Sequence, residues 1–229
     1  MKNNIDELKL LIERAKAEVS VFKANGRNFI NHSFEFNSTI TSDDLKALDL
    51  KYGVCLPEDY CEYLMKIGNG GNQPGCGMFS VQETLAIVSN ETFGESVLAT
   101  SDLASSYCRK FHYDVQLKNY ETATNMTLDD YFDYETLQSS FQHYLIEDRV
   151  DEFDAIEKEM KKHMLIFGFY DEIHVEYAIA LDGKYKGKVV YYTYEAPKNI
   201  KITNLSFLEW MIEYYKNGLE CRPGYFLSV

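Results

Sequence analysis

The stretch from Leu56 to Gly71 constrains the fold of this chain more than any other part of the sequence. Pro57 predicts the start of a helix, because a proline in the first turn gives up an N–H that has no partner there. Glu58 and Asp59 favour the positive end of the helix dipole. Four residues then follow the i, i+3, i+4, i+7 spacing of a packed face: Tyr60, Tyr63, Leu64 and Ile67. Gly68-Asn69-Gly70-Gly71 is expected to end the helix, since glycine accepts a positive φ.

The segments around this stretch also carry helix and strand signals. Residues 4–24 predict an amphipathic helix with apolar side chains at three- and four-residue spacings, stopped by Asn25-Gly26. Thr41 and Asp44 form a capping-box pattern that opens a second helix, which ends at Gly53. Short strands are expected at Phe34-Glu35-Phe36 and at Met78-Phe79-Ser80-Val81.

Two acidic helical patterns occupy the middle of the chain. Residues 84–120 contain plausible short helices around 96–104 and 106–112. Apolar residues at helical spacing then run from Leu128 to Leu145 and from Val150 to Met164, with the carboxylates mainly off the apolar stripe.

The last third predicts an antiparallel meander. Its strands are expected at Met164–Tyr170, Ile173–Leu181 and Lys188–Tyr194, with a turn at Asp182-Gly183 and an end at Pro197. Ser206 and Glu209 then suggest another capping box, which opens a final helix that ends at Gly218. With no repeat or linker, residues 1–229 are interpreted as one α+β domain with a helix at about 4–24 and an acidic helical insertion at about 84–160.

Charge is the strongest global signal. The chain has 23 Lys+Arg and 36 Asp+Glu, a net charge of −13. Residues 121–159 alone hold 12 acidic and two basic residues, a net of −10. Such a field disfavours nucleic acid and anionic membranes and favours basic partners. The acids either form a solvated face that serves solubility or make a patch that meets a basic protein surface.

Cysteine use and hydropathy favour the cytoplasm. The N-terminal residues lack the features of a signal peptide, and no run approaches the ~20 apolar residues of a membrane span. The five cysteines are odd in number and form no C-x-x-C pair, which predicts reduced thiols and no zinc site. Cys55 and Cys61 are expected to be small buried hydrophobic side chains.

Signals for catalysis are weak throughout. The histidines show no metal-ligand spacing, and the regular oxygen-ligand loop of a calcium site is missing around Asp129-Asp130. Cys108 and His112 stand four residues apart, but a cysteine nucleophile needs further oriented groups. The glycine-rich residues 68–77 lack the Lys-Ser/Thr of a phosphate-binding loop. We therefore predict no catalytic residues, no metal and no cofactor, and keep a cysteine- or carboxylate-dependent hydrolase as a third hypothesis.

The order of these motifs resembles the SUKH superfamily, which includes the yeast glucan-synthesis regulator family and many bacterial immunity proteins. The resemblance covers residues 34–82 and 163–218 and includes the Ser-Phe-Leu-Glu-Trp start of the last helix. It implies a mixed sheet with packed helices and no catalytic centre. It also implies fold-determining roles for the family-like positions Leu56, Pro57, Tyr60, Gly70 and Gly71.

The leading hypothesis is an intracellular immunity protein that binds a cognate toxin, expected to be a basic nuclease-type domain, and inhibits it by steric and electrostatic occlusion. The alternative is a non-catalytic regulatory scaffold of the cell-wall-regulator type. The oligomeric state stays open. The predicted partner-binding residues lie in the acidic segment, where aromatic and acidic side chains alternate. They are Asp129, Asp130, Tyr131, Asp133, Tyr134, Glu135, Glu147, Asp148, Asp151, Glu152 and Asp154.

Overall fold

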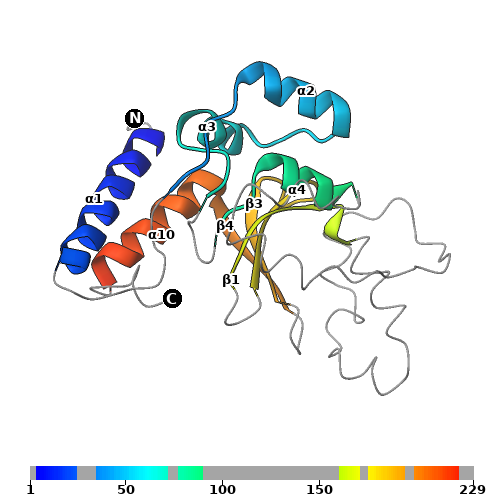
Figure 1. The fold of residues 1–229 in the computed structure, drawn as a ribbon. Helices are drawn as coiled ribbons and strands as arrows, with labels where there is room; N and C mark the ends of the chain where they lie inside the picture. Colours follow the sequence, from blue (N-terminus) through cyan, green and yellow to red (C-terminus); the bar gives the residue numbers. More distant parts are fainter. Residues whose placement is uncertain are drawn as a thin grey trace.

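The computed structural model describes residues 4–24, 35–71, 77–89, 160–170, 175–193 and 199–221. These residues form helices and one antiparallel sheet, as the α+β prediction required (Figure 1). The helices are α1 (Asn4–Ala24), α2 (Ser42–Tyr52), α3 (Glu58–Lys66), α4 (Val81–Val88) and α10 (Phe207–Cys221). The strands are β1 (Met164–Tyr170), β2 (Val175–Ala180), β3 (Lys188–Thr193) and β4 (Asn199–Ser206).

The sheet is a meander in the order β1-β2-β3-β4, and each described pair of neighbours is antiparallel. The first three strands confirm the prediction from sequence. The fourth was missed, because Pro197 was expected to end the meander, whereas β4 begins at Asn199 and pairs with β3. Ile200 and Ile202 alternate with polar Lys201 and Thr203, so a strand signal was present.

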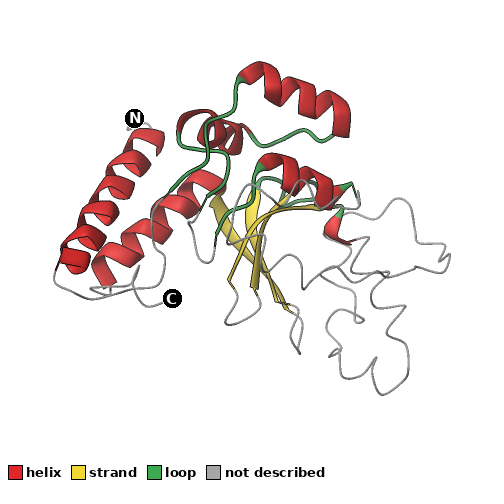
Figure 2. Cartoon of the chain, viewed as in Figure 1, coloured by secondary structure: helices red, strands yellow, loops and turns green. Residues whose placement is uncertain are grey.

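Three isolated bridges continue the sheet beyond β1. Phe36 pairs with Gly71, Gly71 pairs with Met78, and Met78 pairs with Gly168 of β1. The Gly71 and Met78 backbones exchange hydrogen bonds of 2.9 and 2.7 Å. Segments far apart in the sequence therefore lie side by side at the β1 edge, where they satisfy backbone groups that an open edge would expose (Figure 2).

The core lies between the sheet and the helices α1, α3 and α10. Leu165, Ile179 and Val189 stand opposite one another across β1, β2 and β3, and all three are fully buried. Helix α1 runs beside α10 (Figure 1) and confirms the amphipathic helix predicted for residues 4–24. Its buried side is made of the apolar stripe: Ile5, Leu8, Leu11, Ile12 and Ala15. Burial of each large apolar side chain contributes about 1.5–3 kcal/mol.

Two predicted element boundaries were wrong. The strand expected at Met78–Val81 is reduced to an isolated bridge at Met78, because Ser80 and Glu83 form a capping box that opens α4 at Val81. Helix α4 packs against β1. Its residues 84–88 are the first residues of the predicted 84–160 insertion. Helix α10 continues past Gly218 to Cys221, and Leu219 packs against the core. Tertiary packing offsets the roughly 1 kcal/mol that a helical glycine costs.

Two further predictions concern the ends of α3. Pro57 was expected within the first helical turn but lies at the N-cap position, one residue before α3. The helix ends at Lys66, and the glycine-rich residues follow its end, as predicted. Residues 90–159 lie outside the described residues, so the helices predicted around 96–104 and 106–112 and the helical pattern from Leu128 to Leu145 stay predictions. The pattern from Val150 to Met164 is untested as far as Glu159, and its last residue, Met164, begins β1 instead of ending a helix.

Candidate functional site

Helix α3 places the centre of the family-like motif inside the core. Tyr60, Tyr63 and Leu64 are fully buried, and the helical spacing in the sequence had predicted this packed face. The rings of Tyr60 and Tyr63 meet Phe207 of α10 edge-on, with centroids 4.9 and 5.1 Å apart. Phe167 of β1 meets the same Phe207 ring at 5.0 Å. Such edge-to-face pairs fix the relative position of α3, α10 and the sheet.

Burial also determines the ionisation of the tyrosines in this core. Desolvation raises the pKa of Tyr60, Tyr63 and Tyr215 well above the usual value of 10.0. All three hydroxyls are therefore neutral at physiological pH. Their role is to fill the core.

Asp59 joins the start of α3 to the start of α10. Its Oδ2 accepts a hydrogen bond of 3.0 Å from the backbone N–H of Leu208, in the first turn of α10. The backbone N–H of Ser206 donates to Glu209 Oε2 at 2.8 Å, as one half of the predicted capping box requires. Sequence reasoning gave Asp59 only a local dipole role and missed the contact, because its partner lies 149 residues away.

The loop after α3 needs glycine at two of the family-like positions. Gly70 and Gly71 have φ values of 84° and 144°, where side chains are rarely accepted. A Cβ on Gly70 would lie 2.7 Å from the Met78 carbonyl oxygen, and one on Gly71 would collide with the carbonyl oxygen of Glu35. The glycines therefore let neighbouring backbones approach at the sheet edge.

Asn69 connects this loop to α4. Its Oδ1 accepts a hydrogen bond of 2.7 Å from the backbone N–H of Val81, and its Nδ2 donates to Gln82 Oε1 at 2.8 Å. The side chain of Asn37 donates to the Asn69 carbonyl at 2.9 Å. Asn69 was not among the predicted fold determinants, although an asparagine between two glycines was a usable signal.

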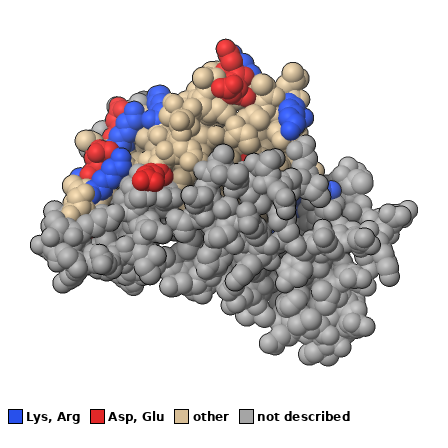
Figure 3. Space-filling model, in the orientation of Figure 1, with Lys and Arg blue, Asp and Glu red and all other residues tan. Residues whose placement is uncertain are grey.

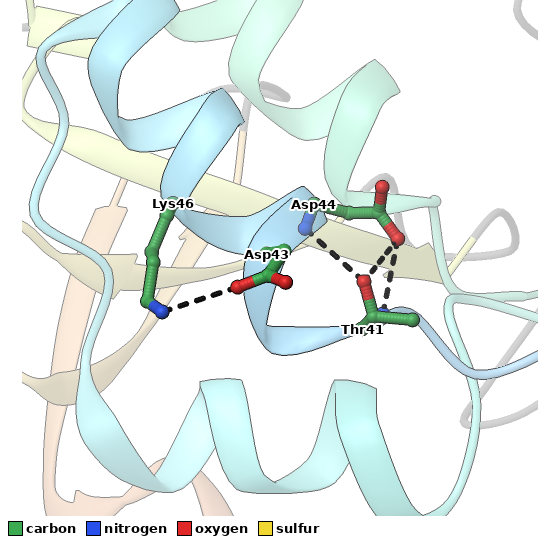
Figure 4. A network of polar contacts seen from close by, with 4 residues as sticks. All are labelled: Thr41, Asp43, Asp44 and Lys46. Atoms are coloured by element: carbon green, nitrogen blue, oxygen red, sulfur yellow. Dashed lines mark hydrogen bonds and ion pairs between the residues drawn. The ribbon is translucent and has the colours of Figure 1, made fainter.

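Helix α2 differs from α3 in being held at both ends by local contacts. The Thr41 side chain accepts from the Asp44 backbone N–H at 3.2 Å, and Asp44 accepts from the Thr41 backbone N–H at 3.3 Å, which confirms the predicted capping box (Figure 4). The same view shows the ion pair between Lys46 and Asp43, 3.2 Å long. Gly53 ends the helix in a left-handed conformation, as predicted.

Other polar side chains of the described chain form pairs. His163 Nδ1 lies 2.5 Å from Asp182 Oδ2, and Lys161 pairs with Glu176 at 3.2 Å. Among the described residues, no group of three or more His, Cys, Asp or Glu could hold a metal ion. No described helix is long and apolar enough to span a membrane.

Cys55 and Cys61 differ in exposure. Cys55 is exposed, so its predicted burial was wrong: it lies in the short connection between α2 and α3. Cys61 is half-buried on α3, and desolvation is the main cause that raises the pKa of its thiol. A raised pKa disfavours the thiolate, so Cys61 has low nucleophilic reactivity.

All the predicted partner-binding residues, from Asp129 to Asp154, lie outside the described part of the chain, so their arrangement is untested. Cys108 and His112, named for the hydrolase hypothesis, also fall outside it. Of the positions predicted to determine the fold, Leu56 is half-buried against the core, Pro57 occupies the N-cap position of α3, Tyr60 is fully buried, and Gly70 and Gly71 take positive φ.

The described residues carry little of the net charge. They contain 17 Asp/Glu and 14 Lys/Arg, a net of −3, against −13 for the whole chain. Several acids are paired with lysines, such as Glu13 with Lys16 and Glu62 with Lys66. Acidic and basic side chains are intermixed on the described surface that Figure 3 shows. Residues 90–159, with 16 Asp/Glu and five Lys/Arg, hold a net of −11.

Comparison with known proteins identifies the family. The model of the SMI1 / KNR4 family (SUKH-1) matches residues 39–213, and the chain therefore belongs to this family. Membership supports an immunity or regulatory role in general, exerted through protein partners. No curated protein and no solved structure matches the chain. Helix α1 precedes the matched range, so it is outside the part of the chain that defines the family.

Proposed function

We propose that this chain is a cytoplasmic immunity protein that binds a cognate toxin and inhibits it by occlusion, without catalysis or a cofactor. The partner is expected to be a basic toxin domain of the nuclease type. Such a domain presents basic residues that hold phosphates, and an acidic binder can cover them.

The uneven distribution of charge carries this proposal. The helices and sheet that define the family fold are nearly balanced in charge, whereas residues 90–159 hold most of the negative excess. A fold needs no such excess, and self-repulsion within one segment costs stability. Opposed charges accelerate encounter with a basic partner, which suits the capture of a toxin inside the cell that makes it.

The buried tyrosine core supports a binding role over a catalytic one. The motif residues with the largest side chains are neutral and packed against α10, so the family-like motif maintains the fold. In this proposal partner choice lies elsewhere, mainly among the acidic residues that follow α4.

Rescue from toxicity tests the function. The toxin domain of a secreted protein encoded beside this chain is expressed in a host with or without the chain. Protection is expected with the chain present. No protection, with both proteins expressed, would contradict the immunity role and leave the cell-wall-type regulatory scaffold as the better candidate for this family.

Charge reversal tests the binding mode. Changing Asp129, Asp130, Asp133, Asp151 and Glu152 to Lys is expected to slow association with the toxin domain by about tenfold or more at low salt. A matched control reverses five acids of the described surface that lie outside α2, namely Asp6, Glu13, Glu18, Glu35 and Glu213. Both variants change the net charge equally, so an equal loss of association rate would show a general charge effect and no acidic binding segment.

A further inference from the structure

We draw no further inference here: the strongest candidate, the surface patch that exposed Lys184 and Lys186 form on the turn between β2 and β3, carries none, because nothing in the structure shows what covers it.

Discussion

Helices α2 and α3 follow each other in the chain but are stabilised in opposite ways. α2 has a complete capping box and a left-handed glycine at its end, yet it buries only Leu45. α3 begins at Pro57 with no side-chain cap, yet it buries Tyr60, Tyr63 and Leu64 completely. Local hydrogen bonds therefore maintain α2, and tertiary packing maintains α3.

This difference separates two kinds of information in the family-like region. The buried side chains of α3 cannot change without disturbing α10 and the sheet, so they specify the fold. The exposed side chains of α2 can change without this cost, so they do not specify the fold. The three predictions that follow test the contrast.

The largest expected effect is alkaline unfolding of the tyrosine core. Above pH 10 the unfolded chain loses the protons of Tyr60, Tyr63 and Tyr215, whereas burial raises the pKa of each in the folded chain. Their stabilisation is complete below pH 10 and falls as the pH rises toward the raised pKa values. Between the pKa of the unfolded chain and that of the folded chain, each tyrosine lowers the free energy of unfolding by about 1.4 kcal/mol per pH unit. The three tyrosines together lower it by about 4 kcal/mol per pH unit.

Circular dichroism against pH, with tyrosinate absorbance recorded in parallel, measures this transition. Tyr63→Phe should reduce the pH dependence of the unfolding free energy by about one third, because one of three titrating groups is gone. If these tyrosines ionised before the fold was lost, they would be accessible to water, and the core described for α3 would be wrong.

The second effect compares a buried leucine in α3 with a half-buried one in α2. Leu64→Ala should lower the free energy of unfolding by about 3 kcal/mol or more, since it leaves a cavity beside the buried tyrosines. Leu48→Ala should cost about 1 kcal/mol, because Leu48 is already partly hydrated. Urea unfolding gives both values. Equal losses would mean that α2 depends on packing as much as α3 does.

The smallest effect is expected for the cap of α2. Thr41→Ala removes the side chain that accepts from the Asp44 backbone and should cost about 1 kcal/mol within the helix. Hydrogen exchange should therefore accelerate about fivefold for α2 amides while α3 amides keep their rates. Thr41→Ser retains the hydroxyl and serves as the control. Acceleration in both helices would show that they unfold together.

Most structural features that depend on residues close together in the chain were predicted correctly from the sequence. The Thr41–Asp44 capping box, the Gly53 stop and the packed face of α3 all depend on neighbours along the chain. The strands β1, β2 and β3 were recognised from their runs of apolar residues. Ser80 opening α4 was missed although it was local, because Met78 and Phe79 suggested a strand that continued through Val81.

Other features depend on parts of the chain that meet only after folding. No pattern in the sequence indicates that Asp59 accepts a hydrogen bond from the backbone N–H of Leu208. Nor does any pattern indicate that Gly71 lies between Glu35 and Met78. The continuation of α10 past Gly218 was equally hidden, because packing of Leu219 overrides the preference of glycine for a helix end.

The acidic segment was visible in the sequence, whereas the exposure of individual apolar side chains was not. The charge of residues 121–159 follows from composition alone and needs no structure to be recognised. The exposure of Leu50 could not be recognised in this way, because Leu45, Leu48 and Leu50 are the same residue type within one short helix. Only packing shows that Leu45 is buried and that Leu50 is 89% exposed.

The sequence by itself thus determined the local elements, the position of the negative charge and the family to which the chain is similar. These properties depend on neighbours in the chain or on composition, and both can be counted. The tertiary structure decided which helices pack, how the glycine loop continues the sheet, and which leucine stays in solvent. Those outcomes depend on burial between distant segments, where the gain in free energy exceeds local preference.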